Sequence, residues 1–160
     1  MVIPLPNLSA NSQVSQLMTH RFGVFFLARG TTPNPLDIRF QEVSGLEANV
    51  KTRDDASAAS SLAQKKIPSG ISYVDLELKR GMVLGSPLRQ QVQSVFNDFA
   101  FTRSDVLLTI YSEFGIPTTS FFFHEAFPIS WQISSLDATS EEFLIETLKL
   151  TYTRMRLLTL

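Results

Sequence analysis

The sequence predicts a mainly β fold: an antiparallel β-barrel or sandwich of about six strands, with one flanking α-helix and an extended loop or hairpin. Three observations carry this prediction. Apolar and polar residues alternate with period two in several stretches, only one stretch shows helical spacing, and the strand–helix rhythm of a parallel sheet does not occur. Thirteen Phe against a single Trp also suit a packed β core.

Length and composition fit one folded domain. The chain has 160 residues, 44% hydrophobic and 18% charged, with a formal net charge of −1. So small a charge gives no general attraction to nucleic acid or to anionic membranes. The sequence lacks cysteine, which excludes disulfides, thiolate metal sites and cysteine nucleophiles. Pro4 and Pro6 stand where a signal peptide needs an apolar run, and no stretch approaches a membrane span, so we expect a chain made in the cytoplasm.

The N-terminal part is expected to hold an arm, two strands and a loop. Residues 1–20, rich in Ser, Asn and Gln, form the arm. Residues 21–29 read as a strand that is apolar on both faces, as a strand covered on both sides would be. Residues 36–51 alternate as a second strand, which Gly45 interrupts as a bulge or bend would. Residues 52–66 are small and charged and make a loop that is long for a compact domain.

One helix is expected over residues 85–99. Ser86 is a favourable N-cap residue, and Pro87 follows at the first helical position, where its missing N–H costs nothing. Helical spacing then places an apolar stripe on one face. The stripe consists of Leu88, Val92, Val95, Phe96 and Phe99.

Four more strands are expected in the rest of the chain. They cover residues 71–81, 105–113, 118–133 and 141–155. The first directs Val74, Leu76 and Leu78 inward by alternation. The second and third flank a turn that contains Gly and Pro, so they form a hairpin. The last is a single long strand.

Acidic residues near the C-terminus raise the question of a catalytic or metal-binding cluster. They are Asp137, Glu141, Glu142 and Glu146. On a strand, Glu142 and Glu146 share one face but lie about 13 Å apart at ~3.3 Å per residue, too far to share a metal ion or a proton. Glu141 points to the opposite face. We therefore expect these side chains to serve hydrogen bonding or subunit contacts.

Other stretches give no support to an enzyme. His124-Glu125 begins like a zinc-protease motif but lacks the second His four residues on. Ser44 has no glycine two residues before it, as a nucleophile elbow requires. The sequence "RGMVLGS" has neither the spacing nor the Lys of a phosphate-binding loop. We expect no catalytic residue, no metal site and no cofactor.

Four stretches, taken in order, resemble one known family. They are "EVSGLEANV", "IPSGISYVDLELKRGM", "HEAFPISW" and "LDATSEEFLIETLKLTY". Together they resemble the tail-tube proteins of contractile phage tails and of phage-tail-like contractile injection systems, which are related in fold to the type VI secretion tube protein. The positions that match the family pattern are Phe40, Val43, Ser44, Gly45, Leu46, Pro68, Gly70, Leu76, Leu78, Arg80, Gly81, Ala126, Phe127, Pro128, Trp131, Leu136, Asp137, Ala138, Ser140, Ile145, Glu146, Thr147, Leu148 and Leu150.

The resemblance, which covers about residues 21–155, implies an assembly. Residues 21–160 would form a single tube-type β-barrel domain, six copies would form a ring, and rings would stack into a hollow tube. The implied partners are a contractile sheath, neighbouring tube-initiator or spike–baseplate proteins, and a cargo of protein toxin or DNA in the lumen. The chain would be made in a bacterium or a phage-infected host and incorporated into an extracellular or virion tail particle.

Charged residues are expected at the subunit or ring contacts. The segment 52–66 corresponds to the extended loop or hairpin that reaches an adjacent subunit or ring in this family, which implicates the charges at its two ends. The whole expected set is Asp54, Asp55, Lys65, Lys66, Glu141, Glu142 and Glu146.

Departures from the family pattern leave alternatives open. Glu141 stands where Asn is usual, the arm 1–20 is long, and Asp54-Asp55 lacks a glycine-rich continuation. These differences point to an alternative beside the repeated shaft protein: a specialised baseplate-proximal ring, which joins the spike and baseplate to the tube. A further alternative is an independent β-barrel binding module, which would be a monomer with an apolar internal pocket.

Overall fold

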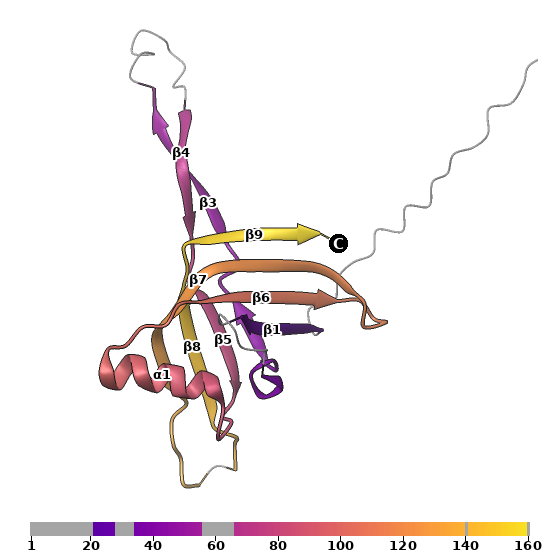
Figure 1. Cartoon of the computed structure of the whole chain (residues 1–160), viewed down its shortest axis with the longest axis vertical. Coiled ribbons are helices and arrows are strands. Elements are labelled where there is room, and N and C mark those ends of the chain that lie inside the picture. Colours follow the sequence, from indigo (N-terminus) through magenta and orange to yellow (C-terminus); the bar gives the residue numbers. More distant parts are fainter. Residues whose placement is uncertain (1–20, 28–33, 56–65, 140, 160) are drawn as a thin grey trace, which may run out of the picture.

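The computed structural model describes residues 21–27, 34–55, 66–139 and 141–159. Within them the chain forms nine β-strands, one α-helix and one short 3₁₀-helix (Figure 1). The mainly β class with one helix is confirmed, and the strands are more numerous than predicted. In chain order the elements are β1 (Phe22–Leu27), η1 (Pro35–Asp37), β2 (Glu42–Ser44), β3 (Ala48–Asp54), β4 (Lys66–Tyr73), β5 (Leu76–Gly81), α1 (Pro87–Asp98), β6 (Ser104–Tyr111), β7 (Pro117–Ile133), β8 (Ile145–Thr151) and β9 (Arg154–Thr159).

The main sheet is antiparallel and bends along its longest strand. Its order is β1-β6-β7-β8-β5-β2, and β9 pairs with the N-terminal part of β7. That part of β7 lies between β6 and β9, whereas residues 127–133 pair with β8. Between the two parts, Glu125 has a φ of 51° and donates its N–H to Asp105 Oδ1 at 2.9 Å. β7 therefore belongs to two halves of a sandwich-like sheet that is not closed between β1 and β2.

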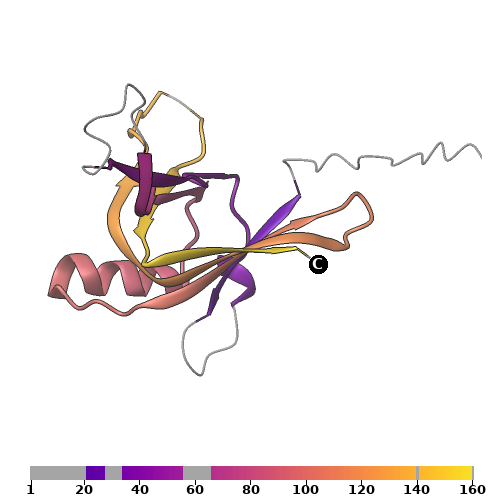
Figure 2. The same ribbon diagram turned by 90° about the horizontal axis from the view of Figure 1, so that it is seen from above.

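The core lies between these two halves and α1. Buried side chains alternate with more accessible ones along β5 and β8, as the period of a half-buried strand requires. The core cluster consists of Val24, Leu76, Leu78, Leu88, Val92, Val106, Leu108, Phe123, Ala126, Leu148, Leu150 and Tyr152. Seen from above, α1 lies beside the strands, and the turn between β6 and β7 extends at the opposite end of the molecule (Figure 2).

The helix begins as predicted. The Ser86 side chain accepts a hydrogen bond from the N–H of Arg89, and Pro87 occupies the first turn. The predicted apolar stripe is only partly correct, because Leu88, Val92 and Val95 are buried whereas Phe96 and Phe99 are exposed. Phe99 ends the helix in the left-handed conformation, with φ at 53°, which turns its ring away from the stripe toward Phe101.

The single strand predicted over residues 141–155 is two strands. β8 begins at Ile145 and ends at Thr151, and β9 begins at Arg154 and pairs with β7 instead of β5. Thr153 N donates to His124 O at the turn between the two strands. The buried alternation of β8 ends at Tyr152, and the apolar Met155 and Leu157 of β9 follow in the opposite phase.

The predicted strands 36–51 and 71–81 are also divided. Gly45, with a φ of 85°, ends β2 and turns the chain into β3, and Val74 and Asp75 separate β4 from β5. Val74 is exposed instead of directed inward. β3 and β4 form a separate two-stranded antiparallel hairpin that projects from the main sheet (Figure 1). The predicted extended hairpin therefore starts at residue 48.

Candidate functional site

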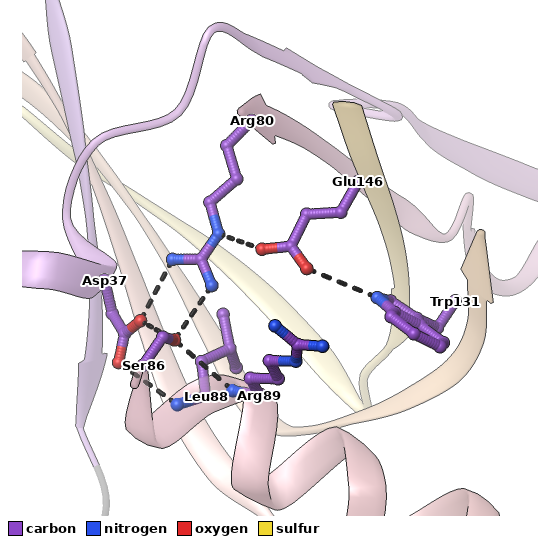
Figure 3. Close-up of polar contacts among 7 residues, drawn as sticks. All are labelled: Asp37, Arg80, Ser86, Leu88, Arg89, Trp131 and Glu146. Atoms are coloured by element: carbon purple, nitrogen blue, oxygen red, sulfur yellow. Dashed lines mark hydrogen bonds and ion pairs between the residues drawn. The ribbon is translucent and has the colours of Figure 1, made fainter. Parts of the chain in front are cut away.

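A buried ion-pair network connects the main sheet to the start of α1 (Figure 3). Arg80 of β5 is 3% exposed, and its guanidinium contacts the carboxylates of Asp37 and Glu146, which are each 5% exposed. Arg80 Nη1 lies 2.9 Å from Asp37 Oδ1, and Arg80 Nη2 donates to Ser86 Oγ at 2.9 Å. The Arg80 guanidinium thus connects β5 to side chains of η1 and β8 and to the N-cap residue of α1.

The carboxylate oxygens of this network all accept hydrogen bonds. Glu146 Oε1 accepts from Arg80 Nε, and Glu146 Oε2 accepts from Trp131 Nε1 at 3.3 Å. Asp37 Oδ1 accepts from Arg80 and from the Ser86 hydroxyl, and Asp37 Oδ2 accepts from the backbone N–H of Leu88 at 3.1 Å. The last contact places a carboxylate at the positive end of the α1 dipole.

This arrangement suits a structural clamp better than an active site. Each carboxylate oxygen accepts at least one hydrogen bond from within the fold, as buried polar groups in a structural network do. Among the residues that the structure describes, no group of three or more His, Cys, Asp or Glu could hold a metal ion. The inward position of Arg80 and Glu146 could have been found from sequence, because both follow the alternation of buried leucines. Their pairing, and the part of Asp37, could not.

The predicted contact residues fall into three places. Asp54 ends β3 and lies opposite Lys66, which begins β4, and Asp55 directly follows β3. Lys65 lies outside the described residues. Glu141 and Glu142 are exposed in the loop between β7 and β8, at the end of the molecule opposite the hairpin (Figure 1). Glu146 is buried in the network.

The β3–β4 hairpin presents apolar and basic side chains to solvent. All seven residues of β3 are exposed. Val50 and Ile71 lie opposite each other across the hairpin and are 64% and 59% exposed. Lys51, Arg53 and Lys66 are also exposed. A two-stranded hairpin with so little burial is marginally stable alone, so this geometry favours a surface that another molecule covers.

The loop between β7 and β8 presents apolar and acidic side chains. Leu136 and Phe143 are 85% and 89% exposed. Together with Asp137 and Glu142 they line a depression of about 450 Å³. The side-chain and backbone hydrogen bonds from Thr139 lower the pKa of Asp137, which keeps this carboxylate ionised. The loop therefore carries negative charge next to exposed apolar side chains.

The outer strands of the main sheet form a further candidate surface. β1 and β2 end the strand order, and β9 lies on the outside of β7. Leu157 and Leu158 of β9 are exposed. Edge strands with apolar side chains invite pairing with another chain, and a closed assembly removes such edges.

Tyr152 gives a prediction for alkaline pH. Its hydroxyl donates to Val74 O at 2.9 Å, and burial, with Tyr73 and Asp75 nearby, raises its pKa from 10.0 to about 12. Because the pKa is higher in the folded state, the stability that Tyr152 contributes is complete below pH 10.0 and is lost as pH rises toward 12. We expect the free energy of unfolding to fall between about pH 9 and pH 11 by about 1 kcal/mol more in the parent protein than in Tyr152→Phe. Urea denaturation at both pH values measures this, and equal falls would contradict it.

The chain is similar to proteins of tail-like injection particles. The family model of the T4-like virus tail tube protein gp19 matches residues 18–156. A chain of the anti-feeding prophage (AFP) baseplate is 32% identical, with 91% of this chain and 97% of that chain covered and a TM-score of 0.81. A chain of the PVC sheath–tube complex, an extracellular contractile injection system in its extended state, is 21% identical, with 91% and 93% covered and a TM-score of 0.72.

A more distant structural likeness concerns the fold alone. Hcp1 from Flavobacterium johnsoniae is 14% identical, with 86% of this chain and 94% of that chain covered and a TM-score of 0.55.

No curated protein matches the chain. In the part of the chain that the structure describes, no helix combines the length and the apolar character that crossing a membrane requires.

The family match extends over most of the chain, and it includes the four motifs that suggested tail-tube proteins from sequence. The chain belongs to the T4-like virus tail tube protein gp19 family.

Proposed function

We propose that this chain is a structural subunit of the inner tube of a contractile injection system or contractile phage tail. Six copies form a ring, and stacked rings form a hollow conduit for cargo. The observation that carries this proposal is the family match over residues 18–156. The AFP baseplate structure, which contains a chain 32% identical to this one, is sixfold symmetrised, and this supports a ring of six.

The main sheet is suited to a ring. In the part formed by β1, β6, β7 and β9, each neighbouring pair is antiparallel. The outer strands β1 and β9 therefore run in opposite directions. If copies stand side by side around a ring, β9 of one copy faces β1 of the next in an antiparallel sense, and the alternation of strand direction continues around the wall. A closed ring also removes the edges that a monomer exposes.

The ring edge gives a testable prediction. Leu157→Lys combined with Leu158→Lys places two charges on β9, where the parent side chains are exposed in the monomer. We expect ring formation to weaken about tenfold or more, because burial of each leucine in the ring would be lost. Phe96→Lys, at an exposed position of α1, is the matched control. Size-exclusion chromatography over a concentration series measures the ring fraction, and equal fractions in both variants would contradict the prediction.

The proposed partners are the components that adjoin the inner tube in a contractile particle. We propose that a contractile sheath surrounds the tube, that spike–baseplate or tube-initiator proteins lie at its end, and that protein toxin or DNA passes through its lumen. The chain is made in the cytoplasm of a bacterium or an infected host and becomes part of an extracellular or virion tail particle. We propose that charged residues lie at the contacts between copies, namely Asp54, Asp55, Lys65, Lys66, Glu141 and Glu142. The hydrogen bonds found for Glu146, in contrast, are internal.

A second candidate is the baseplate-proximal first ring. One observation favours it: the AFP baseplate chain is more similar to this protein than the PVC sheath–tube chain is, with TM-scores of 0.81 and 0.72. In this position the ring joins the spike and baseplate to the first ring of the shaft.

Negative-stain microscopy tests the proposed function and separates the two positions. The protein is purified alone and after co-expression with the products of neighbouring genes. Rings or tubes with a central channel are expected. Tubes formed by the protein alone would support a position in the shaft. Rings that join a tube only in the presence of a neighbouring tube protein would support the position of the first ring. A monomer under all conditions would overturn the tube proposal.

A further inference from the structure

The strands β1, β6 and β9 and the N-terminal part of β7 lie side by side and have one face on the core (Figure 1). The core face carries Val24, Val106, Leu108, Phe123 and Met155. Alternation turns the residues between them to the opposite face. The hydroxyls of Thr109 and Ser120, 3.0 Å apart, and the rings of Phe122 and His124, 4.7 Å apart, meet there. We call this surface the second face, and its main side chains are Phe25, Leu107, Phe122, Arg154, Arg156 and Leu158.

Arginine and apolar side chains are neighbours on the second face. The register of the four strands places one row across the sheet, which consists of Phe25, Leu107, Phe122 and Arg156. The three apolar members are half-buried, whereas Arg154 and Arg156 of β9 are exposed. Among the described residues, neither arginine forms an ion pair with a carboxylate. The second face therefore offers two guanidinium groups beside an apolar strip.

The second face is basic, although the whole chain has a formal net charge of −1. In the described residues of these strands, the charged side chains on this face are Arg154, Arg156 and Asp105, with His124 neutral. Two positive charges and one negative charge give +1 per copy, and thus +6 for a ring of six. A charge of one sign that is repeated around a channel attracts molecules of the opposite sign.

In the proposed ring, the second face turns toward the channel. Six copies of the four strands form a wall with a circumference of roughly 115 Å and a radius of roughly 18 Å, for strands along the axis at ~4.8 Å spacing. A sheet packed ~10 Å inside this wall would have a circumference of only roughly 50 Å. The core face is covered by β2, β5 and β8, and six copies of these strands need roughly 86 Å. The core layer therefore fits only outside the wall.

We infer that the second face binds the cargo, and that this cargo is an acidic polypeptide with apolar side chains among its carboxylates. Arg154 and Arg156 bind the carboxylates, because the planar guanidinium matches the geometry of a carboxylate. The strip around Phe122 contacts the apolar side chains. The inference rests on the proposed function, since only a ring turns this face toward a channel. Contacts that are weak in one copy add up over the six copies of a ring.

The apolar strip favours a polypeptide over duplex DNA. The six residues of β9 span roughly 20 Å at ~3.3 Å per residue. A duplex carries roughly 12 negative charges over that length, about twice the charge of the ring wall. Phe25 and Phe122 would offer no partner to the phosphates, which lose water only at a cost. An acidic polypeptide, in contrast, supplies a partner for both kinds of side chain.

Peptide binding to assembled rings tests the inference. The probe is a fluorescein-labelled peptide of glutamate with interspersed leucine and phenylalanine, and fluorescence anisotropy at low salt measures its binding. Arg154→Gln combined with Arg156→Gln is expected to weaken binding at least about tenfold, because both charges are lost. The matched control, Lys79→Gln with Lys149→Gln, changes the net charge equally at exposed positions of β5 and β8 and should bind as the parent does. Native mass spectrometry verifies the ring in each variant.

Crosslinking in parent rings locates the peptide without any substitution. The same peptide with a benzophenone group is bound to the rings and irradiated, and tandem mass spectrometry identifies the labelled residues. Labels are expected on β7 near Phe122 and on β9 near Arg156. Labels confined to β5, β8 or α1 would show that the peptide binds outside the channel, and the inference would be wrong. This measurement decides if the arginine variant does not form rings.

Three further results would overturn the inference while the tube proposal stands, because rings have formed in each case. The first is equal binding of the acidic peptide and a peptide with lysine in place of glutamate. The second is equal binding of the acidic peptide by the parent and by the arginine variant. The third is tighter binding of fluorescein-labelled duplex DNA than of the acidic peptide. If no rings form, alone or with neighbouring proteins, the tube proposal fails and the inference fails with it.

Discussion

Arg80→Met is expected to lower the free energy of unfolding by about 3–5 kcal/mol, the cost of leaving a buried charge without its partner. The substitution leaves two carboxylates, Asp37 and Glu146, each 5% exposed, without the guanidinium that both contact. The Ser86 hydroxyl and the ring of Phe40, whose centroid lies 5.3 Å from the guanidinium carbon, lose a contact as well. Urea denaturation followed by circular dichroism measures the change.

Lys79→Met is the matched control for this prediction. Lys79 precedes Arg80 on β5 and forms an ion pair of 3.0 Å with Glu42, but its side chain is 34% exposed. Loss of such an exposed pair is expected to change the free energy of unfolding little, because solvent screens the two charges. Adding Glu146→Gln to Arg80→Met removes one of the unpaired carboxylates and should restore part of the stability. Equal losses in Arg80→Met and Lys79→Met would show that the network does not stabilise the fold.

Gly45→Ala is expected to cost about 3 kcal/mol or more in stability. Gly45 has a φ of 85°, and a Cβ at this position would lie 2.0 Å from the backbone oxygen of Asp75. That oxygen belongs to the chain between β4 and β5, so the clash cannot be relieved by rotating a side chain. Since Gly45 is the corner from which the hairpin leaves the main sheet, we also expect the assembly of this variant to fail at temperatures where it is still folded.

Gly85→Ala separates the clash from the backbone conformation. Gly85 also has a positive φ, of 78°, but a Cβ there would meet nothing within 4 Å. It should cost about 1 kcal/mol, the usual penalty for alanine in the left-handed region. The difference between the two thermal midpoints isolates the contact with Asp75. A Gly45→Ala variant that is no less stable than Gly85→Ala would contradict the proposed packing of this corner.

The fold class and the helix could be predicted from sequence because they depend on local periodicity. Leu88, Val92 and Val95 recur at helical spacing after Ser86 and Pro87, and all three are buried. Likewise, Leu76 and Leu78 alternate with polar residues along β5 as a half-buried strand requires. Where one face of an element packs on the core, the pattern and the structure agree.

The divisions between strands could not be predicted in the same way. The apolar alternation changes phase between Tyr73 and Val74 and again between Tyr152 and Met155, near the places where the pairing partner changes. A bulge within a single strand gives the same change of phase, so the pattern does not tell the two apart. All seven residues of β3 are exposed in a single copy of the chain, so neither face of this strand packs on the core. A period reports which side chains share a face, but the partner of a strand depends on contacts distant in sequence.

The buried network shows the same limit. Alternation places Arg80 and Glu146 on inward faces, and a buried charge requires an opposite charge, so the presence of a pair follows from sequence. The pairing of Arg80 with Glu146, 66 residues further along the chain, follows only from the register of β5 with β8. The third member of the network, Asp37, follows only from the position of η1. The contact residues on the hairpin and loop were suggested by resemblance. Their separation to opposite ends of the molecule appears only in three dimensions.

Native mass spectrometry of the purified protein, alone and co-expressed with its neighbouring gene products, determines whether six copies of the chain form a ring. A ring of six copies of the 17.9 kDa chain has a mass of about 107 kDa, and multiples of this mass are expected as rings stack. The sixfold species should be present at low ionic strength and should disappear in the β9 variant with two lysines. If only the mass of one chain is found in all these preparations, the chain is not a tube subunit.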